Sequence, residues 1–281
     1  MTSNNEKPRD SGHIVGRAAQ TSPPNRFELL ACEQDLEQLS AEVLRHELAS
    51  SKVPTEFYVD ESRTLIRANT SPDVPFRYSI NPYRGCEHGC AYCYARPSHE
   101  TLGLNAGLDF ETKVFVKEQA VKLLRDELNQ ASWKGDPITI SGITDCYQPA
   151  ERVYQVTRGC LEVFAESNQP FDIITKNALV VRDLDIMEPA ASRNLVHVHV
   201  SVTTLDAELC RKLEPRTSAP AARLRAIEKL SKAGVPVSVM LAPVIPGMTD
   251  HEVPAILKAC ADAGATTATW LLLRLPMNVA P

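Results

Sequence analysis

Three cysteines lie within eight residues of this chain, in the stretch 82–96 with the sequence PYRGCEHGCAYCYAR. They are Cys86, Cys90 and Cys93. Glycines at positions 85 and 89 allow the backbone to turn tightly. The loop can therefore aim three thiolates at one point, which predicts a metal centre or a cysteine-based reaction.

The motif alone leaves two kinds of metal centre open. A structural zinc ion normally takes four protein ligands, and here the fourth would come from His88, His99 or Cys146. An iron–sulfur cluster also usually takes four cysteines. A cubane cluster held by only three cysteines has one iron that remains open to a small molecule. The five other cysteines are too dispersed to indicate a disulfide framework or an auxiliary cluster.

Apolar runs and helical stretches alternate regularly after residue 75. Strands are expected at 76–81, 113–116 (accessory), 138–141, 171–175, 196–203, 235–242 and 266–273. Helices are expected at 118–130, 150–167, 178–191, 205–213, 220–233 and 250–263. This order predicts an α/β fold with a parallel sheet of six principal strands, either open or curved into a barrel. Ligands then bind at the carboxyl ends of the strands. No Gly-x-Gly-x-x-Gly follows the first strand, which disfavours a dinucleotide site.

Composition and charge narrow the class of protein. The chain has 281 residues, 43% of them hydrophobic, and a net charge of −5, so no global basic field indicates nucleic acid. Its start lacks the apolar region of a signal peptide, and its longest apolar stretch, 235–248, is broken by prolines. We therefore expect a cytoplasmic protein without a membrane partner. Residues 1–60 are predicted to form a polar, partly disordered extension with a helix across 27–48, and residues 61–281 to form the core domain.

Several motifs together resemble one family. The motif Cys-x3-Cys-x-Tyr-Cys after a first strand resembles the radical S-adenosylmethionine (radical SAM) superfamily. The segments that resemble its spore-photoproduct-lyase-like branch are 79–96, 144–151, 174–177, 213–216 and 242–247. The resemblance implies a partial (β/α)6 barrel, a [4Fe-4S] cluster on Cys86, Cys90 and Cys93, and S-adenosyl-L-methionine on the open iron. It also implies reductive cleavage of that cofactor to a 5′-deoxyadenosyl radical, which abstracts hydrogen from an unknown substrate.

The resemblance also implies cofactor-binding positions. Tyr92 matches the aromatic residue that packs beside the nucleoside, and Tyr94 matches the main-chain position near adenine. Lys176 and Ser201 match polar positions at the methionyl end, where an ammonium group can pair with the carboxylate. Three of these residues have a purely structural alternative: Tyr94 in the core, Lys176 as a surface cation, and Ser201 as a cap or packed between strands.

Three further polar residues are candidates with open alternatives. Thr144 and Asp145 stand where many family members carry Gly-Gly-Glu, so the resemblance implies that they accept hydrogen bonds from the cofactor's ammonium group. They are also suited to contacting substrate or to capping the helix that follows. Arg216 is expected to reach into the site and pair with a carboxylate, or to form a salt bridge with Glu214 or a neighbouring residue.

Cysteine and histidine residues outside the loop give weaker signals. Cys146, with its neighbour Tyr147, is expected at the mouth of the barrel as a candidate catalytic pair, although a packed thiol is the alternative. His197 and His199 alternate with valines and must share one face of their strand. They are suited to metal binding or to lining the barrel interior.

The last predicted strand is followed by only eight residues, and no helix is expected among them. We expect the barrel either to be truncated after the sixth strand or to end compactly. The leading hypothesis is a radical SAM enzyme of unknown substrate, with lyase chemistry and a reducing donor such as flavodoxin or ferredoxin as partner. A DNA lesion is a substrate hypothesis that the acidic balance does not support. The alternatives are a non-catalytic zinc- or cluster-binding protein and an inactive barrel.

Overall fold

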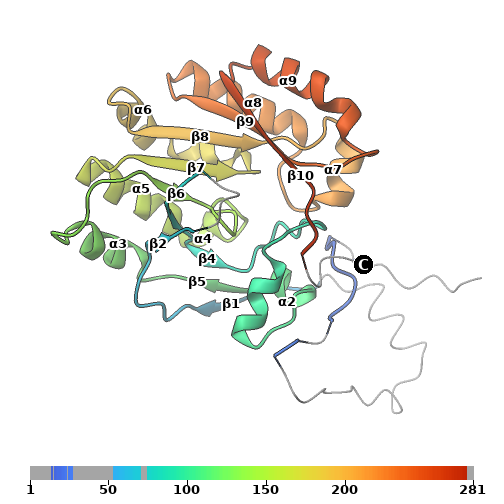
Figure 1. Ribbon diagram of the computed structural model, residues 1–281, viewed down its shortest axis with the longest axis horizontal. Helices are drawn as coiled ribbons and strands as arrows, with labels where there is room; N and C mark the ends of the chain where they lie inside the picture. The colour runs from blue at the N-terminus through green and yellow to red at the C-terminus, as the bar shows by residue number, and fades with distance from the viewer. Residues whose placement is uncertain (1–13, 15, 24, 28–52, 71–74, 277–281) are drawn as a thin grey trace, which may run out of the picture.

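The computed structural model describes residues 14, 16–23, 25–27, 53–70 and 75–276, and it contains two sheets. The larger sheet has the strand order β10-β9-β8-β7-β6-β3-β2. Its strands are β2 (Arg67–Ala68), β3 (Tyr78–Ile80), β6 (Ile138–Ile140), β7 (Phe171–Thr175), β8 (Val196–Ser201), β9 (Val237–Val244) and β10 (Thr267–Leu272). Every neighbouring pair from β3 to β10 is parallel, and β2 pairs with β3 antiparallel. Figure 1 shows these strands running side by side through the molecule.

Helices connect the parallel strands, as parallel pairing requires. They are α3 (Ala120–Leu128), α4 (Glu151–Tyr154), α5 (Val156–Ser167), η3 (Ala178–Asp183), α6 (Leu184–Ala191), α7 (Ala207–Leu213), α8 (Pro220–Lys232), η4 (Asp250–Glu252) and α9 (Val253–Asp262). Alternating residues of the strands pack against these helices. In β8, Val196, Val198 and Val200 are at most 5% exposed and join the main hydrophobic core, whereas His197 and His199 are half-buried on the opposite face. We call that opposite face of the larger sheet the open face.

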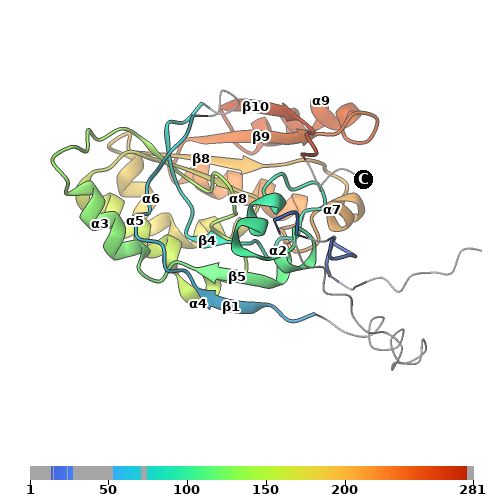
Figure 2. The same cartoon turned by 60° about the horizontal axis from the view of Figure 1, so that its bottom comes forward.

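The smaller sheet has the order β1-β5-β4 and lies beside α2, as Figure 2 shows. Its parts are β1 (Glu56–Val59), β4 (Tyr83–Arg84), η2 (Arg96–Leu102), α2 (Leu108–Thr112) and β5 (Lys113–Val116). The run predicted as accessory, 113–116, is the central strand of this sheet. The cysteine loop begins directly after β4. Because β4 pairs with β5, the smaller sheet holds the start of this loop in place.

Part of the predicted N-terminal extension packs on this smaller unit. The guanidinium of Arg17 is buried and donates to the carbonyl of Glu111 at 2.9 Å and to the hydroxyl of Thr55 at 2.9 Å. The amide of Asn25 donates to the carbonyl of Glu100 at 3.1 Å. The segment therefore makes specific contacts next to α2 and η2. The helix predicted across 27–48 falls almost entirely outside the described residues.

The α/β prediction is confirmed, and several predicted boundaries are close to those observed. The strand at 171–175 has the predicted ends. The single helix predicted across 150–167 is divided into α4 and α5 because Gln155 adopts a left-handed conformation, with φ of 50°. Within the described residues, β10 and β2 are the two edges of the larger sheet and do not pair with one another. The described part of the chain contains no helix with the length and apolarity needed to cross a bilayer.

Candidate cluster and cofactor site

The cysteine loop follows β4 and is held by backbone hydrogen bonds on both sides. Cys86 donates its amide to the carbonyl of Phe110 at 2.9 Å, and Ala91 donates to the carbonyl of Leu213 at 2.9 Å. Gly85 has a φ of +77°, and a Cβ there would lie 2.9 Å from the carbonyl oxygen of Lys113. The loop is therefore packed against α2 and β5 on one side and against the end of α7 on the other, and glycine is needed at this turn.

The three thiols are enclosed but are not all fully buried. Cys86 is 7% exposed and Cys90 8% exposed, whereas Cys93 is half-buried, and none of the three forms a disulfide. Burial is the largest cause that raises the pKa of Cys90 and Cys93, and nearby Lys176 partly offsets it at Cys90. Bound iron stabilises the thiolate form of its ligands, which is the form that burial disfavours.

No set of three or more His, Cys, Asp or Glu side chains among the described residues is arranged to hold a single metal ion. The expectation that the loop aims its thiolates at one point is therefore not met for a single ion. A cubane cluster makes a different demand, because each thiolate ligates a different iron atom. Three free cysteines on one turn, held on both sides by the fold, fit that donor set.

An ion pair braces the outer side of the loop. The Arg96 guanidinium donates to the carbonyl of Cys90 at 2.8 Å and pairs with the Glu111 carboxylate at 2.5 Å. Both side chains are buried. A Cβ at Gly89 would lie 2.6 Å from the Glu111 carboxylate, so a larger residue would displace this pair. This ion pair could not be predicted from the sequence, because Arg96 and Glu111 belong to no metal-binding pattern.

A second buried network lies under Tyr92. The Tyr92 hydroxyl donates to the Glu214 carboxylate, which also accepts from the Thr203 hydroxyl at 2.8 Å and forms an ion pair with Arg223. Burial acts to raise the pKa of Glu214, but Arg223 and then Lys176 outweigh it, and the pKa falls to about 2. The carboxylate is therefore ionised and holds the Tyr92 hydroxyl in place.

Lys176 follows β7 and points toward the cysteine loop. Its ammonium group donates to the carbonyl of Ala242 at 3.2 Å and lies 5.9 Å from the centre of the Tyr92 ring. That distance suits a cation–π contact. Lys176 and Tyr92, which were predicted separately as cofactor-binding residues, therefore lie close together. The ammonium group has only one protein hydrogen bond described, which leaves donors for a ligand.

Asp145 links the ends of two strands to the loop. Its carboxylate accepts from the backbone amide of Lys176 at 2.7 Å and from the Thr175 hydroxyl at 2.8 Å. It also lies 3.3 Å from Nδ1 of His88. Burial acts to raise the pKa of Asp145, but His88 outweighs it and lowers the pKa to about 2. Asp145 is therefore placed beneath the loop with its oxygens already engaged.

The other predicted cofactor residues have the following surroundings. The Thr144 hydroxyl donates to the carbonyl of Tyr83 at 2.8 Å, and that side chain is buried. Tyr94 is 57% exposed, and its hydroxyl donates to the carbonyl of Gly142. Ser201 is buried at the carboxyl end of β8, and its carbonyl accepts from Arg223 at 2.9 Å. Tyr94 therefore presents an exposed ring, whereas Thr144 faces the interior.

Arg216 pairs with the cysteine loop itself. Its guanidinium lies 3.1 Å from the carboxylate of Glu87, which also accepts from the Thr55 hydroxyl at 2.9 Å. The Arg216 amide donates to the carbonyl of His88 at 3.3 Å. The predicted carboxylate partner is therefore Glu87 rather than Glu214, because Arg223 occupies the Glu214 side chain.

Cys146 and Tyr147 lie in the main hydrophobic core and are both 0% exposed. The Cys146 amide donates to the Ser141 hydroxyl at 2.6 Å, and the Tyr147 hydroxyl donates to Asp183 at 3.0 Å. Burial is the main cause that raises the pKa of both side chains. The structure thus places the two predicted catalytic residues inside the protein, not at an exposed mouth.

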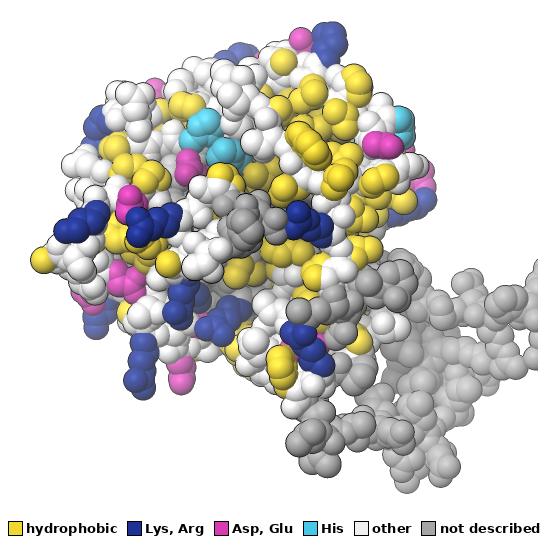
Figure 3. All heavy atoms as spheres, in the orientation of Figure 1, with side chains coloured by type: hydrophobic (Ala, Val, Ile, Leu, Met, Phe, Trp, Pro, Cys, Tyr) yellow, Lys and Arg dark blue, Asp and Glu magenta, His cyan; other side chains and the backbone are white. Residues whose placement is uncertain are grey.

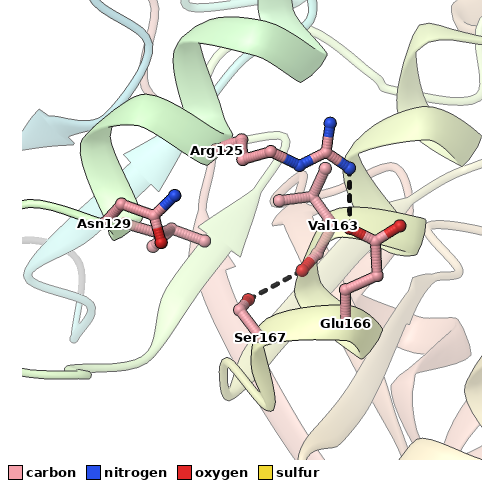
Figure 4. A pocket seen from close by; sticks show the side chains of 6 residues that line it. Arg125, Asn129, Val163, Glu166 and Ser167 are labelled. Carbon is pink, nitrogen blue, oxygen red and sulfur yellow. Dashed lines mark hydrogen bonds and ion pairs between the residues drawn. The ribbon is translucent and has the colours of Figure 1, made fainter.

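A surface cavity also lies between α3 and α5, away from the thiols. Figure 4 shows its lining, in which Arg125 and Glu166 form an ion pair at 2.6 Å. Both side chains are about half exposed. The cavity carries no thiol, histidine or buried charge, so the contacts that it contains are those of helix packing.

Comparison with known proteins points to one family. A family profile described as the radical SAM superfamily matches residues 80–260. An uncharacterized protein of Mycobacterium tuberculosis is 43% identical over 204 residues, which cover 72% of this chain and 60% of the relative. A radical SAM Nalpha-GlyT isomerase of Pseudomonas phage M6 is 25% identical over 198 residues, 70% of this chain and 39% of the isomerase. The chain thus spans about 60% of the length of the first of these relatives.

Solved structures with the same fold include spore photoproduct lyase. A variant of that enzyme with bound AdoMet and dinucleoside spore photoproduct superimposes with a TM-score of 0.60. The alignment covers 91% of this chain and 70% of the lyase, at 16% sequence identity. At that identity the likeness concerns the fold alone.

Proposed function

Because this chain belongs to the radical SAM superfamily, we propose that Cys86, Cys90 and Cys93 hold a [4Fe-4S] cluster that binds S-adenosylmethionine. The observation that carries the proposal is the placement of the three free cysteines, with Tyr92 and Lys176 beside them at the carboxyl ends of the strands. When bound, these cofactors supply reductive cleavage of S-adenosylmethionine to a 5′-deoxyadenosyl radical, which abstracts hydrogen from substrate.

The chain's own residues bind and orient these groups. Lys176 offers its ammonium group to the cofactor's carboxylate, since its stem is directed over Tyr92 toward the loop. Glu214 and Arg223 hold the Tyr92 ring in place. Glu111 and Arg96 keep the loop closed around the carbonyl of Cys90. Tyr94, exposed beside Gly142, is positioned to contact the nucleoside.

We further propose the architecture around the site, the type of reaction and the electron donor. The six parallel strands from β3 to β10 form a partial (β/α)6 barrel around the site. The reaction is lyase-type, in line with the fold shared with spore photoproduct lyase. One-electron reduction requires a donor, and a flavodoxin or ferredoxin is of the right chemical class.

The test is anaerobic purification of the full chain, followed by counts of iron, sulfide and zinc. About four iron atoms per chain are expected, as the ligand chemistry of a cubane requires. Reduction in the presence of S-adenosylmethionine should then yield 5′-deoxyadenosine. One zinc ion per chain and no iron would instead identify a structural zinc protein. A full cluster without any 5′-deoxyadenosine would reject the catalytic proposal while retaining the cluster.

A further inference from the structure

The open face carries connected polar side chains on five neighbouring strands. Asp172 on β7 is hydrogen-bonded to Thr139 on β6 and lies near His197 on β8. The His197 ring shares a hydrogen bond of 2.6 Å with the Ser238 hydroxyl on β9, and Ser238 contacts the Thr267 hydroxyl on β10. His199 stacks on His197, with ring centres 4.6 Å apart. We call these six residues the polar ladder.

A polar ladder is unusual on a parallel sheet. Such sheets are normally covered on both faces, and their strands are apolar throughout. The helix-facing side of β7 and β8 follows that rule, since its core residues are Phe171, Ile173, Val196, Val198 and Val200. Burying polar groups without partners costs free energy. A face built from hydroxyls, imidazoles and a carboxylate is therefore suited to water or to a polar ligand. Figure 3 shows histidine side chains at the surface of the face that carries β7 and β8.

One atom of the polar ladder lacks a partner. Within the described part of the chain, Nδ1 of His199 is buried and has no hydrogen-bond partner. Leaving a buried polar atom unpaired costs about 1–3 kcal/mol. A ligand that hydrogen-bonds to this nitrogen removes that cost. The parallel stacking of the two rings, at 14°, leaves their edges available for such contacts.

The charge state of the polar ladder selects among ligands. Burial, and next the neighbouring His197, lower the pKa of His199 to about 4, so this imidazole is neutral at pH 7. Burial raises the pKa of Asp172, and His197 partly offsets that effect. His199 thus adds no charge to this set, and Asp172 is the one acidic residue among the six. Neutral imidazoles and hydroxyls both donate and accept hydrogen bonds, which suits an uncharged polar group and disfavours an anion next to Asp172.

The polar ladder and the cysteine loop lie at different levels of the sheet. His197 and Ser201 are four residues apart on β8, which corresponds to about 13 Å along a strand. Ser201 is connected to the cysteine loop, since Arg223 bonds its carbonyl and also pairs with Glu214 beneath Tyr92. A molecule that extends from the cysteine loop along the open face would reach His199 and then His197.

We propose that the polar ladder binds an uncharged hydroxyl- or amide-bearing end of the substrate, about 13 Å from the end that reacts beside the cysteine loop. The proposal rests on the proposed radical SAM function for the position of the reacting end. The substrate is then an elongated polar molecule, and neither a hydrocarbon nor a polyanion. Since no group of three metal-ligating side chains is found among the described residues, the histidine pair is assigned to hydrogen bonding.

The test uses the full chain with its cluster in place and isotope-labelled histidine, followed by NMR of the imidazole resonances. Three probes are titrated separately: D-ribose for hydroxyls, N-acetylglycinamide for the amide, and inorganic phosphate as the anion. Ribose or the amide should shift the His197 and His199 resonances in a saturable manner, and which of them acts identifies the source of the uncharged group. Phosphate should leave both resonances unchanged, and the exposed His251 serves as an internal control.

Two variants refine the result. His199→Phe removes both ring nitrogens and should weaken probe binding, read at His197, by at least fivefold. His199→Gln keeps a donor and an acceptor and should retain most of the binding. Absence of any shift with both uncharged probes, or an equal shift with phosphate, would overturn the proposal. Formation of 5′-deoxyadenosine is measured on the same samples, so that failure of the catalytic proposal is recorded separately from failure of this one.

Discussion

Two buried networks of tyrosine, carboxylate and arginine side chains lie in the described part of this protein, and one of them contacts the cysteine loop. The first, here called the loop network, consists of Tyr92, Thr203, Glu214 and Arg223. The second, here called the helix network, consists of Tyr83, Glu151, Arg158, Arg182 and Asp183. In both, a tyrosine donates to a fully buried carboxylate that is paired with arginine.

The networks differ in where their cations lie. The arginines of the helix network keep about a quarter of their side-chain surface exposed, whereas Arg223 is 1% exposed. The loop network is also next to the free thiols and to Lys176. A buried carboxylate paired with arginine is thus present in both networks, and it is the neighbouring thiols that assign one of them to a functional site. Four predictions, from the largest expected effect to the smallest, test this distinction.

Removal of a predicted cluster ligand should have the largest effect. Cys93→Ala is expected to abolish both iron binding and 5′-deoxyadenosine formation, because two thiolates do not retain a cubane. The measurement is iron per chain after anaerobic reconstitution. The matched control is Cys260→Ala, which removes a buried free cysteine from α9. Equal iron in the two variants would contradict the assignment of the loop.

Breaking each network should separate stability from cofactor binding. Glu214→Gln leaves the buried Arg223 without its carboxylate and should lower the free energy of unfolding by about 3–5 kcal/mol. Glu151→Gln removes one partner of Arg182, which is a quarter exposed and keeps Asp183, so the loss there should be about 1–3 kcal/mol. Only Glu214→Gln should also weaken S-adenosylmethionine binding, by about tenfold, because Tyr92 and Lys176 lie above that carboxylate. Urea denaturation and equilibrium binding measure the two effects. A comparable loss of binding in Glu151→Gln would show that the networks are not distinct.

The loop network should also respond to acid. The folded pKa of Glu214 is about 2, below the unfolded value near 4.3. A depressed pKa contributes stability above the unfolded pKa, and that stability is lost as pH falls through the folded pKa. The contribution is about 3 kcal/mol at neutral pH, and it should decline between about pH 5 and pH 2. Urea denaturation of the apoprotein at pH 6, 4 and 3 measures this slope. If Glu214→Gln has the same slope as the natural chain, another group is responsible.

The smallest effect is expected at a pair whose arginine is partly exposed. Arg216→Ala removes the ion pair with Glu87, whose buried carboxylate keeps the Thr55 hydroxyl as a donor, so the free energy of unfolding should fall by about 1–3 kcal/mol. S-adenosylmethionine binding should weaken by about fivefold, because Glu87 belongs to the cysteine loop. Arg125→Ala is the control, since it removes a more exposed ion pair, with Glu166, between α3 and α5 and away from the cysteine loop. An unchanged affinity in Arg216→Ala would limit Arg216 to a structural contact.

The sequence by itself determined the order of strands and helices and the location of the three cysteines. Hydrophobic periodicity is a local property, so 171–175 and 196–203 could be predicted as strands before their neighbours were known. The same pattern placed His197 and His199 on one face. Cysteine spacing is also local, which is why Cys86, Cys90 and Cys93 could be recognised as a unit.

Only the tertiary structure decided which distant side chains meet. Glu214 lies 122 residues beyond Tyr92, and Glu111 reaches Arg96 from another element. No period or motif records such contacts, because they depend on how α2, α7 and the cysteine loop pack. The same packing put Cys146 and Tyr147 in the core, although their place after β6 predicted a mouth. It also joined Thr139, Asp172, His197, Ser238 and Thr267 across five strands, since the register between strands is set by the sheet as a whole.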